Sequence, residues 1–212
     1  MIPNFRSKLY LHIYFKFLIF ILKTFLIFSL IFFIKSSRAI DISKLPEYKK
    51  TKAGLYLTAV DAYEMKKNKE NVLFIDIRTR SEIIYLGMPS SVDANIPWLE
   101  YSKNFSWDEK NNRFLTEHNK NFEQEFTRRL IENGLNQNAN IILICRSGSR
   151  SASAADFLDK LGFGKVYSVV DGYEGDVVKE GSNSGKRLIN GWKNSGLPWS
   201  YKLNKNKMYL ID

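Results

Sequence analysis

The sequence predicts an α/β domain with a mainly parallel central sheet, preceded by a leader segment. Short apolar runs alternate with segments of helical periodicity, which is the order expected when strands and crossover helices follow one another. Two runs, VLFIDI at 72–77 and IILIC at 141–145, lack polar alternation, as do strands that are buried on both faces. In parallel sheets of this class ligands bind beyond the carboxyl ends of the strands, so Cys145, at the end of the second run, is a candidate site residue.

The first 39 residues differ from the rest of the chain in charge. The chain of 212 residues has 32 Lys and Arg against 22 Asp and Glu, a formal net charge of +10. Six basic and no acidic residues lie in residues 1–39, so the remaining 26 basic and 22 acidic residues leave only +4. A large basic excess suggests a polyanionic partner. Here the excess lies mostly in the leader, and no arginine-rich recognition helix is visible, so we expect no nucleic-acid partner.

Residues 17–34 are the most apolar stretch of the chain. Lys23 interrupts this stretch, and the clean run after it is eleven residues long, which suits the core of a secretory signal and is short for a membrane span. Small residues at Ser37 and Ala39 favour cleavage after Ala39. The alternative is an uncleaved anchor over 17–34, the chain's sole membrane contact, with Lys23 reaching the cytoplasmic side. Under both interpretations residues 40–212 lie outside the cytoplasm, and we expect a periplasmic location.

The predicted elements of the exported part follow in chain order. Residues 40–54 are polar and are interpreted as a linker to a domain over 55–200. We expect strands at 53–57, 72–77, 92–96, 141–145 and 166–170, and helices at 58–68, 122–134, 149–161 and 188–197. Residues 98–121 are predicted to be an irregular excursion, 174–190 a long glycine-containing loop, and 201–212 a C-terminal tail.

The one cysteine of the chain, Cys145, lies where the strongest predicted strand ends and a helix begins. One cysteine and two histidines exclude an intrachain disulfide framework and leave too few ligands for a Cys/His zinc site, so no metal or other cofactor is expected. Most lone cysteines are buried structural residues. The polar residues that directly follow this one are incompatible with a dry core, so a functional site is predicted.

The sequence after Cys145 combines three effects that stabilise an anion. Free N–H groups at the start of the predicted helix favour negative charge. Arg146 and Arg150 add positive charge, and Gly148 allows successive N–H groups to face inward as a nest. Together these effects favour a thiolate at neutral pH and an anionic ligand beside it.

The segment Cys145-Arg146-Ser147-Gly148-Ser149-Arg150 resembles the six-residue active-site loop of the rhodanese sulfurtransferase family. Other matches follow in the family's order: LFIDIR at 73–78, NIP at 95–97, VVDGY at 169–173, GW at 191–192 and GLPW at 196–199. The resemblance covers residues 55–200. The sequence departs from the family's pattern at 87–89, where Gly-Met-Pro stands for the frequent Gly-His-Ile, and in its longer loops at 98–121 and 174–190.

The resemblance implies a sulfurtransferase that works in two half-reactions. Cys145 would take a sulfane sulfur from a small anionic donor, such as thiosulfate or a persulfide, and pass it to a thiol or cyanide. The substrate-binding residues would be Arg146, Ser147, Gly148, Ser149 and Arg150, with the guanidinium forks of the two arginines suited to an oxyanion.

Three charged residues of the first central strand and the following segment are assigned to structural support. Asp76 ends the strand. Arg78 and Glu82 have the spacing of a pair across one helical turn. We therefore expect an ion pair between Arg78 and Glu82 that braces the scaffold.

Two other functions stay open. A noncatalytic or sulfur-carrier module would dock on a protein partner through the long loops, since a fold does not determine a function. A cysteine-based phosphatase or arsenate reductase would generally place five residues between Cys and Arg. Four residues separate Cys145 from Arg150 here, and Ser151 stands at the next position. The shorter ring is expected to be too tight for a phosphate-sized anion.

Overall fold

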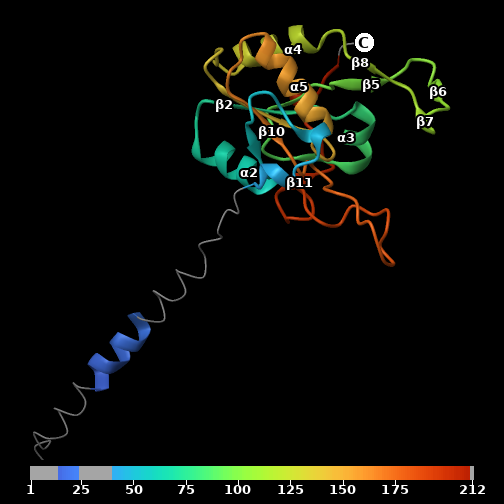
Figure 1. The fold of residues 1–212 in the computed structure, drawn as a ribbon. Helices are drawn as coiled ribbons and strands as arrows, with labels where there is room; N and C mark the ends of the chain where they lie inside the picture. The colour runs from blue at the N-terminus through green and yellow to red at the C-terminus, as the bar shows by residue number, and fades with distance from the viewer. Residues whose placement is uncertain (1–13, 24–39, 211–212) are drawn as a thin grey trace, which may run out of the picture. The chain divides into compact units, whose positions relative to one another are not determined.

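The structure is a computed structural model that describes residues 14–23 and 40–210 (Figure 1). Residues 14–23 form a helix, and the folded domain belongs to a separate compact unit, Ile40–Asp212. Most of the predicted signal or anchor, including the cleavage site at Ala39, lies outside the described residues. Within the described ranges, no helix has both the length and the apolar character needed to cross a membrane.

Five parallel strands form the central sheet, in the order β1-β10-β9-β2-β4. These strands are β1 (Tyr56–Leu57), β2 (Val72–Asp76), β4 (Ala94–Asn95), β9 (Asn140–Ile144) and β10 (Val166–Val169). The central strand β9 pairs with β2 along its whole length, from Asn140 opposite Val72 to Ile144 opposite Asp76. Helices cover both faces of this pair, which is why the two apolar runs show no alternation. The predicted α/β class is confirmed.

Two pairs of helices cover the two faces of the sheet (Figure 1). One face carries α2 (Ala59–Asn68) and α3 (Arg80–Leu86), and the other carries α4 (Phe122–Glu132) and α5 (Ser149–Lys160). Successive residues of β2 point to opposite faces, so Phe74 packs with Trp192 under α2 and α3, whereas Leu73 packs with Phe126 and Leu158 under α4 and α5. Each face therefore has its own apolar core.

Residues 99–118 form a projecting arm with antiparallel strands (Figure 1). Strand β5 (Leu99–Tyr101) pairs with β8 (Thr116–His118), and β6 (Trp107–Asp108) pairs with β7 (Arg113–Phe114). We call this segment the aromatic arm. The prediction of an irregular excursion is wrong here, because Trp107 opposite Phe114 forms an aromatic cross-strand pair and Asn112, at φ 51°, adopts the left-handed conformation that a tight turn needs.

The predicted helix at 188–197 is wrong. The segment forms consecutive turns, in which Gly191 adopts φ 94° and Gly196 adopts φ 68°. Gly191 also packs so closely on Gly175 that a Cβ atom would lie 2.5 Å from the Gly175 nitrogen. Further along, β11 (Trp199–Ser200) pairs with β3 (Met88–Pro89). The predicted strands at 53–57 and 92–96 are each present but only two residues long.

The segment interpreted as a linker packs on the domain. It contains two short 3-10 helices, η1 (Ile42–Lys44) and η2 (Glu47–Lys49). Lys49 is buried, and its Nζ donates to the Val170 carbonyl oxygen at 2.8 Å and pairs with Asp176 at 2.6 Å. The folded unit thus includes residues upstream of the predicted domain start.

The C-terminal segment also packs on the domain. Tyr209, which follows η3 (Lys205–Lys207), is buried, and its hydroxyl donates to Asn119 at 3.0 Å. The segment described as a tail therefore contacts the residue that directly follows the aromatic arm.

Candidate active site

Cys145 lies directly after β9 and is fully buried. Three residues turn the chain before α5 begins at Ser149. Gly148 adopts φ 94°, and a Cβ atom at this position would lie 2.2 Å from the Val170 carbonyl oxygen. Because both the backbone conformation and the close approach exclude a side chain, only glycine fits at this turn.

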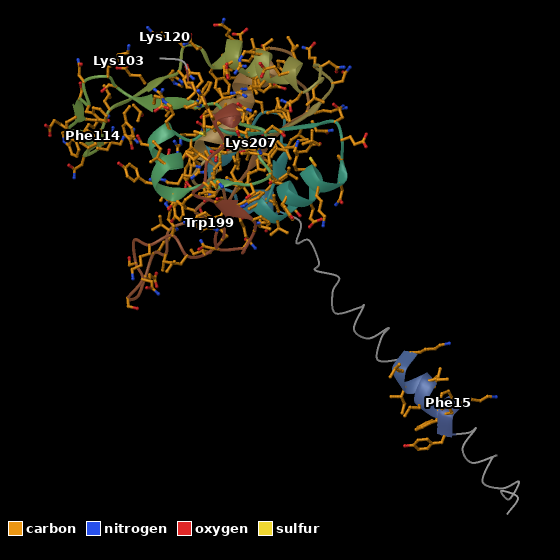
Figure 2. All side chains as sticks on the ribbon, turned by 180° about the vertical axis from the view of Figure 1, so that it is seen from behind. Phe15, Lys103, Phe114, Lys120, Trp199 and Lys207 are labelled. Carbon is orange, nitrogen blue, oxygen red and sulfur yellow. The ribbon has the colours of Figure 1, made fainter. Side chains whose placement is uncertain are left out.

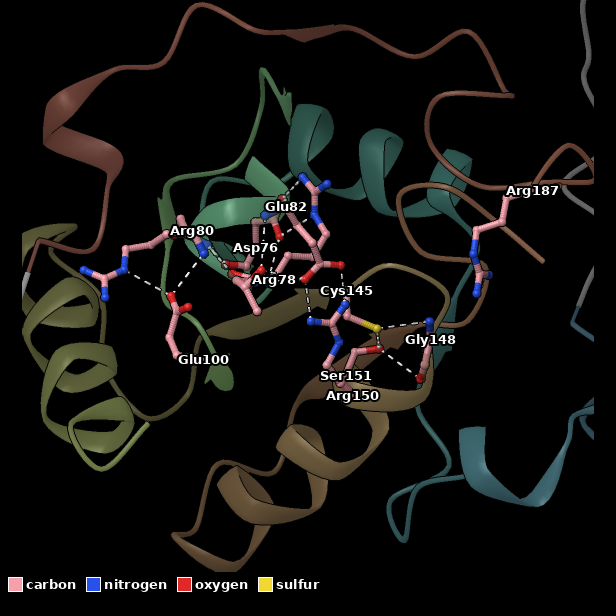
Figure 3. A network of polar contacts seen from close by, with 12 residues as sticks. Asp76, Arg78, Arg80, Glu82, Glu100, Cys145, Gly148, Arg150, Ser151 and Arg187 are labelled. Carbon is pink, nitrogen blue, oxygen red and sulfur yellow. Dashed lines mark hydrogen bonds and ion pairs between the residues drawn. The ribbon is translucent and has the colours of Figure 1, made fainter. Parts of the chain in front are cut away.

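The sulfur of Cys145 lies at the N-terminus of α5 (Figure 3). The Gly148 N–H donates to Sγ at 3.1 Å, and Ser151 Oγ lies 3.6 Å from Sγ. Ser151 Oγ in turn donates to the Gly148 carbonyl at 3.1 Å and lies 2.8 Å from Ser168 Oγ. The backbone donor and the end of the helix both favour negative charge on the sulfur.

Residues 170–174 support the loop from behind. The Tyr173 N–H donates to the Cys145 carbonyl at 2.8 Å, and the Glu174 N–H donates to the Arg146 carbonyl at 3.0 Å. Gly172 lies so close to the loop that a Cβ atom on Gly172 would be 2.5 Å from the Ser147 nitrogen. These contacts hold the first part of the turn and explain why a VVDGY segment accompanies the cysteine loop.

The side chain of Asp171 connects residues 170–174 to two other segments of the chain. Its carboxylate accepts from the Ala59 N–H at 2.8 Å and from the Gly191 N–H at 3.1 Å. Burial raises the pKa of Asp171 to about 6, although the two N–H groups act in the opposite direction.

Arg150 and Glu82 form a bidentate ion pair beside the loop (Figure 3). Both guanidinium–carboxylate distances are 2.6 Å, and the two side chains are only 18% and 13% exposed. Burial by itself would raise the pKa of Glu82, but the hydrogen bonds and charge of Arg150 lower it to about 2. The predicted Arg78–Glu82 pair is therefore wrong. Residue 78 precedes Thr79, the N-cap of α3, so the spacing from 78 to 82 is not that of one helical turn.

Arg78 instead pairs with Asp76, and both side chains are fully buried. Arg78 Nη2 donates to Asp76 at 2.6 Å and to the Gly87 carbonyl at 2.8 Å, and the guanidinium lies 3.7 Å from the centre of the Tyr173 ring. The Asn95 side-chain amide donates to the backbone carbonyls of Asp76 and Arg78, each at 2.9 Å. These contacts join β2, α3 and β4 beneath the site.

Two arginines near the loop have no carboxylate partner in the described part of the chain. The Arg146 side chain is exposed and makes no hydrogen bond or ion pair to another described residue, and Arg187 donates to the Gly175 carbonyl at 2.5 Å. Burial, followed by the positive charge of Arg146, lowers the pKa of Arg187, whereas the negative charges of Glu174 and Asp176 act in the opposite direction. Arg187 was missed in the sequence because a basic residue in a glycine-containing loop has no spacing that relates it to Cys145.

A cleft of about 510 Å³ opens above the loop. Its walls include four of the predicted substrate-binding residues and several residues of the aromatic arm: Arg146, Ser147, Ser149, Arg150, Leu99, Tyr101, Trp107, Arg113, Phe114 and Thr116. Gly148 lies behind this surface, against the sulfur. The structure thus brings the predicted residues of the loop together, with the guanidinium fork of Arg150 held by Glu82.

No group of three or more His, Cys, Asp or Glu residues lies together in the described part of the chain in a way that could hold a metal ion. His118, the histidine of the aromatic arm, packs edge-on against Trp98 at 4.8 Å.

These features define an α/β protein in which a lone cysteine, at the end of a central parallel strand, is enclosed by the turn before the next helix. Residues 58–177 match the model of the Rhodanese-like domain family. The chain belongs to this family, and the expectation from the cysteine loop and its flanking motifs is confirmed.

The relatives and solved structures that match include two rickettsial proteins and one crystal structure, each covering about two thirds of the chain. "Uncharacterized protein RP600 homolog" of Rickettsia rickettsii is 32% identical over 145 residues, which is 68% of this chain and 96% of the relative. "Uncharacterized protein RC0915" of Rickettsia conorii is 31% identical over 146 residues, with the same coverage. The crystal structure of Rv0390 from M. tuberculosis has 26% sequence identity and a TM-score of 0.52, covering 69% of this chain and 96% of that chain.

Proposed function

We propose that the protein is a rhodanese-type sulfurtransferase that carries a sulfane sulfur on Cys145. The observation that carries this proposal is the position of Sγ at the N-terminus of α5, 3.1 Å from the Gly148 nitrogen. A thiolate and a persulfide are both anions, so the same donor stabilises the free and the sulfur-loaded enzyme.

The first half-reaction loads the cysteine. The Cys145 thiolate attacks the outer sulfur of thiosulfate, a new S–S bond forms, and the S–S bond of thiosulfate breaks with its electron pair leaving on sulfite. In the second half-reaction the acceptor, cyanide or a thiolate, attacks the outer sulfur of the persulfide. The bond to the acceptor forms, the Cys145 S–S bond breaks, and its electron pair restores the thiolate.

Arg146, which lines the cleft, and Arg187, which lines a pocket that shares Ser147 with the cleft, supply positive charge for the donor. Neither has a carboxylate partner among the described residues, so each is available to an oxyanion. Arg150 has a different role, because Glu82 occupies its fork: it holds α3 against the start of α5 and keeps the loop in place.

The geometry argues against phosphatase chemistry. A phosphatase of this design needs the arginine at the end of the loop to bind the phosphate, whereas both terminal nitrogens of Arg150 bind Glu82 here. A noncatalytic or carrier module has no such conflict. Loading and turnover distinguish these two alternatives from an enzyme. A noncatalytic module does not load sulfur, and a sulfur carrier loads it but does not transfer it repeatedly.

Intact-mass measurement tests the proposal. The reduced protein should gain one sulfur atom after incubation with thiosulfate and lose it after addition of cyanide. Cys145→Ser should abolish the gain, because the chain has no other cysteine. Ser153→Ala, on the surface of α5, should leave the gain unchanged. A folded, reduced protein that gains no sulfur from thiosulfate or a persulfide would refute the proposal.

A further inference from the structure

The aromatic arm exposes an unusual amount of aromatic surface next to the candidate active site. Phe105, Trp107 and Phe114 are 61%, 46% and 48% exposed. Figure 2 shows Phe114 in the arm, away from the central sheet. The rings contact one another, with Trp107 and Phe114 edge-to-face at 5.2 Å and Phe105 and Phe114 at 6.1 Å, but they belong to neither apolar core. A contiguous exposed patch of this kind marks a binding surface.

The patch faces the cysteine loop across the cleft. Tyr101, Trp107 and Phe114 line the same space of about 510 Å³ as Arg146 and Ser147. This volume lies within the range of pockets that take small organic molecules. Thiosulfate has no apolar part to place against three aromatic rings, so an inorganic donor alone does not account for this wall.

The charge of the cleft indicates the polar part of its occupant. Three arginines and one glutamate are among its lining residues. Glu82 neutralises Arg150, and Arg113 lies 3.7 Å from Asp108, whereas the Arg146 side chain has no partner among the described residues. An occupant that combines apolar surface with an anionic group complements this arrangement.

We propose that the cleft selects an organic persulfide that carries a carboxylate. The carboxylate binds Arg146, the carbon skeleton packs against Trp107 and Phe114, and the terminal sulfur faces the loop that encloses Cys145. The thiolate attacks this terminal sulfur, the new S–S bond forms, and the S–S bond of the donor breaks with its electron pair leaving on the organic thiolate. This inference rests on the proposed function and specifies the donor class within it.

A binding experiment tests the cleft without sulfur transfer. S-methylglutathione, a thioether of peptide size with two carboxylates, serves as the probe for the Cys145→Ser protein, and calorimetry measures its Kd. Adding Trp107→Ala should raise Kd about tenfold, the size expected for the loss of one aromatic contact, and Trp107→Phe should restore most of the affinity. Phe105→Ala is the matched control, since Phe105 belongs to the same aromatic cluster but does not line the cleft. In this control the Kd of S-methylglutathione should change less than twofold.

A loading experiment compares two donors on the otherwise unmodified protein. Trp107→Ala should raise the concentration of glutathione persulfide for half-maximal loading about tenfold, and that of thiosulfate less than twofold. Arg146→Gln should raise both, because both donors are anions. This contrast distinguishes the aromatic wall from the general anion site.

The outcomes separate the two proposals. Loading by both donors without any effect of Trp107→Ala overturns the organic-persulfide inference and leaves the sulfurtransferase proposal intact. Equal effects of Trp107→Ala and Phe105→Ala also overturn the inference, because they indicate a general loosening of the arm. No binding of S-methylglutathione overturns it as well and favours a partner protein at this surface. Binding that depends on Trp107, with no loading by either donor, refutes the sulfurtransferase proposal while supporting an organic-anion cleft.

Discussion

The ion pair between Glu82 and Arg150 should stabilise the protein in a manner that depends on pH. Glu82→Gln removes the negative charge and keeps the shape of the side chain and an oxygen that can accept from the Thr79 N–H. The variant leaves Arg150 charged, largely buried and without its carboxylate. A buried charge that loses its partner destabilises the folded state.

The pKa of Glu82 determines the expected difference in unfolding free energy between the wild type and Glu82→Gln. It falls from 4.5 to about 2 on folding, and at roughly 1.4 kcal/mol for each pH unit this corresponds to about 3 kcal/mol. Because the folded pKa is depressed, this stabilisation is fully present above pH 4.5 and is lost as the pH falls toward 2. The difference between the wild type and Glu82→Gln should therefore be about 3 kcal/mol at pH 7 and about 1 kcal/mol at pH 3.

Urea unfolding of the two proteins at several pH values measures this difference. Glu132→Gln is the matched control, since Glu132 pairs with Arg128 on the exposed side of α4. Its effect should stay below about 1 kcal/mol at every pH. A difference for Glu82→Gln that is equally small at pH 7, or that does not change between pH 7 and pH 3, would refute the assignment of a stabilising pair.

Four further results are expected. Gly148→Ala should destabilise the fold by at least about 2 kcal/mol in urea unfolding, against about 1 kcal/mol for Gly134→Ala, because both positions have positive φ but only Gly148 lacks space for a Cβ atom. The pKa of Asp171 rises from 3.8 to about 6 on folding, so wild-type stability relative to Asp171→Asn should fall by about 2 kcal/mol as the pH rises from 4 to 6, and a flat difference would contradict this. Arg187→Gln should raise the thiosulfate concentration for half-maximal loading of the cysteine several-fold, while the loss of its hydrogen bond to the Gly175 carbonyl should lower stability by only about 1 kcal/mol. Mass analysis of the exported protein should find an N-terminus at Ile40, and a full-length chain would favour the uncleaved anchor.

The position of the reactive cysteine could be predicted because it depends on neighbouring residues. An uninterrupted apolar run produces β9, a helical pattern produces α5, and the turn between them carries Cys145 with its polar neighbours. Burial on both faces and the geometry of a helix start are local consequences of residue type. The loop and both flanking elements therefore follow from the sequence.

The partners of the loop could not be predicted in the same way. Glu82 and Arg150 are 68 positions apart and meet only because α3 and α5 approach each other at one end of the sheet. The local spacing favoured Arg78, which faces Asp76 instead. Arg187 lines a pocket that shares Ser147 with the cleft, and it lies in a segment whose path depends on glycine contacts, such as that of Gly191 with Gly175. Such contacts depend on tertiary structure and leave no periodic signal.

The buried ammonium of Lys49 has a practical consequence for any fragment of this protein. It binds the Val170 carbonyl, the same oxygen that leaves no space for a Cβ atom at Gly148. A recombinant fragment that starts at residue 58, where the family match begins, would lack this lysine, so that a carbonyl behind the cysteine turn and the carboxylate of Asp176 would lose their shared cation. An expression boundary upstream of residue 40 keeps this contact, whereas homology alone would place the cut inside the folded unit.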